Sequence, residues 1–271
     1  MDQDKGGGGL MGRGVVTVVA ATVLVLLGLM ALAIFLPPFL ESQTKSGEME
    51  QAEEVRELFS QIQTELYRLA QGESRAFVFP MSSGSFFLYP TGRAASLSFG
   101  MRWTENDLGR VVYSMTTRSY PSYTLALEGG GVVLEQEGRS LMTFPPFLVR
   151  TLDLGENLVR VEVEWIYLVG ENVRVSKRGP ATLTLQGLEE GYSAWAENEP
   201  NAENVVVDLT GRVEYENAWG QYLGELAGEL NAKGLNASVS GLKLTVSGKG
   251  APGTKDLYYF ERYRKVGVWL A

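Results

Sequence analysis

The chain contains no cysteine and no histidine among its 271 residues. The lack of both excludes disulfide frameworks, cysteine nucleophiles, histidine-based triads and metal sites built from these two residues. Positive charge is also scarce, because 24 lysines and arginines face 32 aspartates and glutamates, and no basic cluster extends beyond Arg262 to Lys265. Proteins that bind duplex nucleic acid need a contiguous positive surface to displace counterions, so nucleic acid is excluded as a partner.

Carboxylate pairs and serine–lysine arrangements are the remaining routes to catalysis, and no segment combines such residues in a recognisable context. The strand period assigns Glu162 and Glu164 to solvent, where a carboxylate is a poor general acid at neutral pH. The acidic segment Glu197 to Asn204 lacks the spacing of a calcium loop and is interpreted as a solvated loop. We therefore expect no enzyme, no cofactor and no metal.

One long hydrophobic run extends without charge from Val15 to Leu36. As a helix it is about 33 Å long, enough to cross a hydrocarbon core about 30 Å thick. A cleaved secretory signal has an apolar region of only about 7–15 residues that ends in small residues, whereas this run ends in Phe35-Leu36-Pro37-Pro38-Phe39. The sequence predicts a leader over residues 1–14 and a transmembrane or filament-core helix over residues 15–40.

The charges around this run bear on its orientation. Lys5 and Arg13 precede it and are offset by Asp2 and Asp4, so the positive-inside signal is small. The short N-terminal side is placed inside by default and the large domain outside. We expect a cell-surface protein, either anchored in the membrane by this helix or assembled into an extracellular filament.

Residues 41–75 are predicted to form a linker and an amphipathic stalk helix. Pro37-Pro38 should break or kink the first helix because proline lacks a donor and clashes with the preceding turn. A polar linker from Glu41 to Gly47 follows, and then a helix from Glu48 to Gln71. Its apolar face is predicted to dock on the core of the following domain, although it could instead continue the anchor into an assembly. The docking residues are Val55, Phe59, Ile62, Leu66 and Leu69.

Residues 76–271 are predicted to form a β-rich extracellular domain. From Ala76 onward the hydrophobic period becomes two, as in VRVEVEW from Val159 to Trp165, and glycine-rich turns separate the strands. Such short strands favour an antiparallel, sandwich-like arrangement. One helix is expected from Glu216 to Gly234, although three glycines weaken that pattern. The predicted fold class is therefore α+β.

Three segments resemble a known family. Gly12-Arg13-Gly14 leads directly into the apolar run, which is similar to the leader of type IV pilin-like proteins of the archaeal branch. The segment from Tyr120 to Pro146 and the helix from Asn217 to Leu226 resemble parts of archaeal pilin-like exported proteins, and Phe59, Ile62 and Gln63 fit the same family. The resemblance implies processing at Arg13 and Gly14, a surface location and no assigned catalytic activity. Pro37-Pro38 departs from the smooth stem of a pilin.

Two functions of different classes remain open. The first is a pilin-like structural subunit, or minor component of a filament, that forms a homo-oligomer through its N-terminal helix. The second is a monomeric, single-pass anchored adhesion module whose β domain binds a surface polymer; an anchored enzyme is a distant third. The predicted helix-packing residues, which could also simply face lipid, are Val16, Val19, Val23, Leu26, Leu27 and Met30. Asn236-Ala237-Ser238 is a glycan acceptor triplet.

Overall fold

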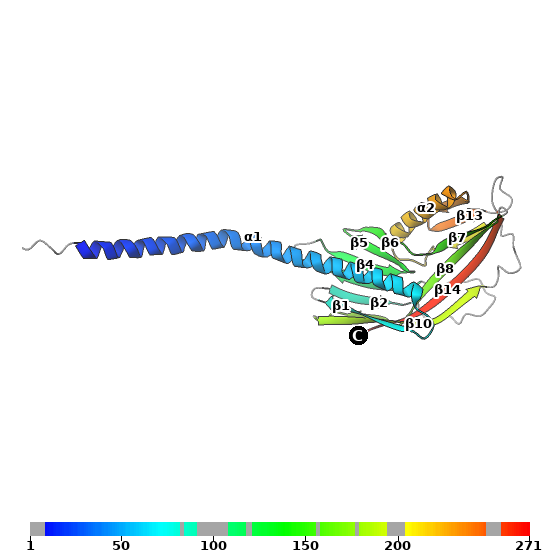
Figure 1. Cartoon of the computed structure of the whole chain (residues 1–271), viewed down its shortest axis with the longest axis horizontal. Helices are drawn as coiled ribbons and strands as arrows, with labels where there is room; N and C mark the ends of the chain where they lie inside the picture. Colours follow the sequence, from blue (N-terminus) through cyan, green and yellow to red (C-terminus); the bar gives the residue numbers. More distant parts are fainter. Residues whose placement is uncertain are drawn as a thin grey trace, which may run out of the picture. The chain divides into compact units, whose positions relative to one another are not determined.

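The computed structural model describes residues 9–81, 84–90, 108–117, 121–155, 158–176, 179–193, 204–247 and 256–271, with side chains omitted for residues 9–20 and 192–193. The chain divides into two compact units, Met1–Glu50 and Gln51–Ala271, referred to below as the N-terminal and C-terminal units. Helix α1, Gly9–Arg68, contributes residues to both (Figure 1).

Helix α1 is continuous over 60 residues and contains Pro37 and Pro38. The predicted break and the predicted linker from Glu41 to Gly47 are therefore wrong, because these residues are helical. Each proline removes only one donor from the helical ladder, and its steric effect is confined to the preceding turn. The residues on both sides of the pair include good helix formers, so the helix resumes after it. The helix ends at Arg68 rather than at the predicted Gln71.

The described strands of the C-terminal unit form three sheets. The five-stranded sheet has the order β1-β10-β14-β8-β7, the six-stranded sheet β6-β5-β4-β3-β2-β9 and the three-stranded sheet β11-β13-β12. Named pairs among the described strands are antiparallel except β8 with β14, which run parallel. The predicted α+β class, with a mainly antiparallel domain and a later helix, is confirmed. The strands are β1 (Ser74–Met81), β2 (Gly84–Tyr89), β3 (Arg110–Met115), β4 (Tyr123–Glu128), β5 (Gly131–Gln136), β6 (Arg139–Phe144), β7 (Val149–Gly155), β8 (Leu158–Gly170), β9 (Val173–Val175), β10 (Gly179–Ser193), β11 (Asn204–Asp208), β12 (Asn236–Ser240), β13 (Lys243–Ser247) and β14 (Asp256–Leu270).

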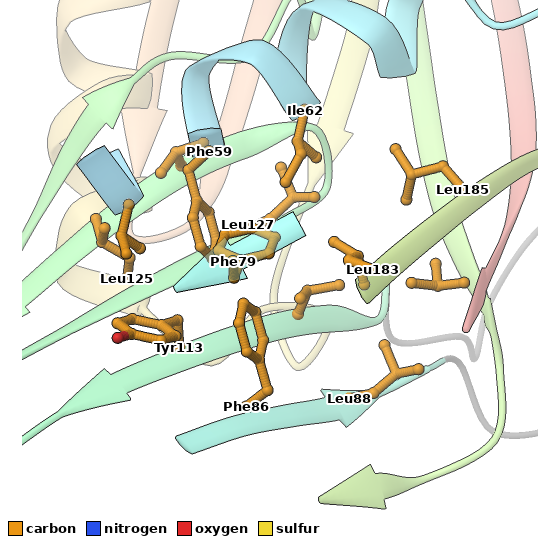
Figure 2. Close-up of a cluster of buried hydrophobic side chains, with 14 of the residues drawn as sticks. Phe59, Ile62, Phe79, Phe86, Leu88, Tyr113, Leu125, Leu127, Leu183 and Leu185 are labelled. Atoms are coloured by element: carbon orange, nitrogen blue, oxygen red, sulfur yellow. The ribbon is translucent and has the colours of Figure 1, made fainter. Parts of the chain in front are cut away.

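The first core of the C-terminal unit lies among the last turns of α1, the five-stranded sheet and the six-stranded sheet. Figure 2 shows Phe59 and Ile62 of α1 gathered with Phe79 of β1 and with leucines from β4 and β10. The ring of Phe79 contacts Phe59 edge-on, with 5.8 Å between centroids. Val55, Phe59, Ile62 and Leu66 are fully buried and Leu69 is 4% exposed, so the predicted docking face is an integral part of this core.

The second core lies between helix α2, Glu216–Ala232, the three-stranded sheet and part of β8. Trp219, Leu223 and Leu230 of α2 point into it. The glycines of α2 do not break the helix, and a Cβ added at Gly220, Gly224 or Gly228 would meet nothing within 4 Å, so no close contact requires glycine there. Glycine at these three positions lowers the intrinsic stability of the helix, and the packing of the buried face of α2 offsets that loss.

Candidate functional site

The N-terminal unit presents an apolar helical surface. Every side chain described from residue 21 to residue 40 is exposed, including Leu27 at 56%. Within the described residues, one helix is long and apolar enough to cross a membrane. No side chain described between residues 21 and 50 covers this surface, and an apolar surface of this size is typical of segments that contact lipid or other protein.

The predicted helix-packing residues fall on this surface where their side chains are described. Val23, Leu26, Leu27 and Met30 are exposed. Val16 and Val19 lie in α1, but among the residues whose side chains the structure does not describe. The predicted processing residues, Arg13 and Gly14, also lie in the N-terminal part of α1, and their side chains belong to the same undescribed stretch.

The C-terminal unit carries a helix clamp that holds α1 through Gln63. The Nε2 of this buried amide lies within hydrogen-bond distance of three backbone carbonyls, those of Gly130 at 2.9 Å, Phe144 at 3.0 Å and Pro145 at 2.9 Å, so that its two hydrogens are shared among the three. Strand β6 ends at Phe144, and Pro145 and Pro146 have no N–H with which to continue a ladder, so the carbonyls of this segment need partners outside the sheet. A side-chain donor from the helix supplies the missing partner.

Two tyrosines complete the helix clamp. The N–H of Phe147 donates to the Tyr67 hydroxyl at 3.0 Å, and the two rings meet edge-on with 4.9 Å between centroids. From α2, the Tyr222 hydroxyl donates to the carbonyl of Pro146 at 2.9 Å. Burial raises the pKa of both phenols above the ordinary value of 10.0, which further favours their neutral form.

The clamp requires glycine at the tip of the β4–β5 hairpin. Gly129 and Gly130 both have positive φ angles, +55° and +81°. A Cβ at Gly130 would collide with the Tyr67 hydroxyl and would lie 2.8 Å from Cδ1 of Ile166. The left-handed backbone and the close approach of α1 therefore both select glycine here.

A buried carboxylate connects the same hairpin to α2. Glu128, at the end of β4, has no exposed surface and accepts hydrogen bonds from Trp219 Nε1 and from the N–H of Glu214, both at 2.8 Å. Burial raises its pKa, and the hydrogen bonds from Glu214 and Trp219 offset only part of that effect. No periodic pattern predicts a role for Glu128, although an acid directly before three glycines, together with a tryptophan in α2, is a signal in the sequence.

A second polar cluster lies at the end of α1. Arg264 of β14 donates from Nε to Glu164 at 2.7 Å and from Nη1 to the carbonyl of Leu69 at 3.3 Å. Glu164 is 5% exposed, so its predicted solvent position is wrong, whereas Glu162 is half-buried. The alternation fails because this part of β8 contributes to both cores and is covered on both faces. Arg150 also pairs with Glu164, at 3.5 Å.

Glu164 is thus surrounded by guanidinium groups, which makes it a structural ion-pair partner. In the part of the chain that the structure describes, no group of three or more acidic side chains is arranged to hold a metal ion. The predicted acidic loop from Glu197 lies outside the described residues up to Asn204, where β11 begins.

The predicted glycan acceptor lies on the three-stranded sheet. Asn236 is the first residue of β12, and both Asn236 and Ser238 are exposed, while Ala237 between them is buried. This strand is an edge strand that pairs with β13 on one side.

No family model, no curated protein and no solved structure matches this chain. Leaving the leader aside, the parts of the chain that were compared with archaeal pilin-like proteins lie in one place. Gln63, the glycine-rich hairpin tip with the Phe144–Phe147 segment, and α2 with Trp219 and Tyr222 together form the helix clamp and its Glu128 support.

Proposed function

We propose that the protein is a pilin-like structural protein of the cell surface, a subunit or minor component of an extracellular filament. In this role the apolar part of α1 packs with copies of itself, and the C-terminal unit forms the outer part of the assembly. The observation that carries the proposal is the exposed apolar surface of α1 between residues 21 and 40. A helix that is apolar all round must bury its whole circumference, and a central bundle of such helices does so.

Helix–helix contact is favoured by the small residues within this surface. Gly28 has open space at its Cβ position, and Ala21, Ala31 and Ala33 are also small. Small residues allow the backbones of neighbouring helices to approach closely and to gain van der Waals contact. Such positions favour protein neighbours, whereas lipid chains adapt equally to large side chains.

The continuity of α1 also supports a filament stem. The sequence predicts an interruption at Pro37-Pro38, which would separate a packing helix from the outer domain, whereas α1 extends from Gly9 to Arg68. Its last turns belong to the C-terminal unit and are held there by the helix clamp. A stem built in this way can carry load between the packing helix and the domain without an unstructured joint.

A single-pass membrane anchor for a monomeric adhesion module is the alternative function. The observation that favours it is that α1 has the length and composition to cross a bilayer. In that case Val23, Leu26, Leu27 and Met30 contact lipid only, and the C-terminal unit binds a surface polymer or partner.

Electron microscopy of the shed surface fraction of the native cell separates the two. The proposal predicts fibres that contain this chain, identified by antibody labelling or by mass spectrometry of the purified fibres. A chain that is absent from the shed fraction and is extracted only by detergent, as a monomer, contradicts the filament.

A further inference from the structure

The outer face of the three-stranded sheet is built mainly from polar side chains. Strand alternation places Ala237, Val205 and Leu244 on the inner face, where they join the second core with α2. The residues of the opposite face are Asn204, Val206 and Asp208 of β11, Lys243, Thr245 and Ser247 of β13, and Asn236, Ser238 and Ser240 of β12. This face therefore offers hydroxyl and amide groups, and its larger side chains are Val206 and Lys243.

The acceptor triplet is positioned at one border of this face. Asn236 and Ser238 are two residues apart on β12, so their side chains emerge on the same side, and both are exposed. The backbone of the intervening Ala237 is fixed at the free edge by Asn231 of α2, which donates to its carbonyl at 2.9 Å and accepts from its N–H at 2.7 Å. The triplet is thus held extended with its amide and hydroxyl directed to solvent.

We infer that Asn236 is a site of N-linked glycosylation. In the transfer step the Nδ2 atom of Asn236 attacks the anomeric carbon of an oligosaccharide carried on a lipid phosphate or diphosphate. The carbon–oxygen bond to the phosphate breaks, the lipid phosphate leaves, Nδ2 loses one proton and an N-glycosidic bond forms. Ser238 supplies the hydroxyl that a transferase requires two residues after its acceptor.

This inference rests on the proposed function, because transfer takes place on the outer side of the membrane. It adds that the sheet of β11, β12 and β13 faces solvent in the assembly. A bulky hydrophilic glycan on that face is incompatible with its burial between neighbouring subunits, so contacts between C-terminal units must use other surfaces.

Cell-free synthesis of the full chain with glycosylation-competent microsomes tests the inference. Intact mass and peptide mapping, before and after removal of N-glycans, give the number and position of glycans, and protease protection gives the side of the membrane. We expect one glycan at Asn236 in the natural chain. It should be lost in Asn236→Gln and Ser238→Ala, and retained in Ser238→Thr and in the control Ser240→Ala on the same strand.

Val206→Thr provides the matched control because it completes an Asn-x-Thr triplet at Asn204, at the opposite border of the same face. This variant should carry two glycans. A protease-protected chain in which Asn236 is unmodified overturns the inference, whether or not Val206→Thr is modified at Asn204. Modification at Asn204 alone would leave the outer placement of the domain intact. Digestion of the C-terminal unit by external protease contradicts that placement, and with it the proposed function.

Discussion

At the residue scale, the C-terminal unit depends on a few buried polar groups that satisfy backbone atoms of distant segments. Gln63 donates to carbonyls of the hairpin tip and of the proline segment, and Arg264 donates to the carbonyl of Leu69 near the end of α1. Neither role follows from a local pattern. Gln63 lies beside the apolar stripe of α1, whereas Arg264 lies in a charged stretch of β14, and the partners of the two are 67 and 195 residues away in the chain.

Replacement of Gln63 by alanine should destabilise the C-terminal unit by about 1–3 kcal/mol, because it leaves buried carbonyls without a donor. Gln61→Ala is the matched control, since Gln61 lies on the exposed side of the same helix and should change stability by less than about 0.5 kcal/mol. Urea unfolding of the detergent-solubilised full chain, followed by tryptophan fluorescence, gives both values. Equal effects of the two substitutions would show that the clamp contributes nothing to stability.

Glu128 should make the stability depend on pH. Burial raises its pKa in the folded chain above the ordinary carboxyl value of 4.5, so the folded state binds a proton that the unfolded state has released. The contribution is fully present below the unfolded pKa and is lost as pH rises through the folded pKa. As the pH rises from the unfolded pKa through the folded pKa, the natural chain should therefore lose stability relative to Glu128→Gln, whose side chain stays neutral. Urea unfolding at several pH values above about 4.5 measures this difference, with exposed Glu54→Gln as the control; identical pH profiles for the natural chain and Glu128→Gln would refute it.

At the element scale, long periodic patterns were sufficient to predict α2, the β-rich domain and the apolar stripe of the second half of α1. The predicted linker from Glu41 to Gly47 is helical because the helix formers around the two prolines outweigh the prolines and the few polar residues. The predicted exposure of Glu164 is wrong because alternation of polar and apolar residues indicates exposure only in a strand that is covered on one face. The clamp itself could not be derived, since carbonyls of an irregular segment leave no periodic signal.

The buried apolar stripe of α1 should contribute strongly to the stability of the C-terminal unit. Ile62 is fully buried among residues of both large sheets, so Ile62→Ala should cost about 2–5 kcal/mol through lost contacts and a residual cavity. The exposed Glu57→Ala on the same helix should have an effect near zero. Thermal unfolding of the full chain in detergent checks both. A melting temperature unchanged by Ile62→Ala would mean that this face is not docked in the isolated protein.

At the scale of the whole molecule, the chain joins an apolar helical unit to a β-rich unit that is complete in its own cores. The two units differ in how they bury apolar side chains, because the C-terminal unit has two buried hydrophobic cores whereas the described side chains of residues 21–40 are all exposed. In the proposed function the first unit provides assembly and the second the surface of the filament. Removal of the leader would release the apolar helix for that assembly.

Processing should occur next to Gly14, because Arg13-Gly14 adjoins an apolar run that is too long for a secretory signal. N-terminal sequencing of the mature protein from its native cell should find a start within or next to Gly14 and Val15. Gly14→Leu should impair processing, and Gly6→Leu, which alters the comparable Lys5-Gly6 pair, should not. A mature chain that starts at Met1 or beyond Pro38 would contradict the proposed leader.

Cysteine cross-linking in intact cells tests most directly whether the apolar helices pack against one another. The natural chain has no cysteine, so Leu27→Cys and Leu32→Cys each introduce a single thiol, at positions that are 56% and 57% exposed. The two positions are separated by about 140° around the helix, and only Leu27 belongs to the predicted packing face. Mild oxidation should yield covalent dimers, more from Leu27→Cys than from Leu32→Cys. Monomers from both variants would contradict the account.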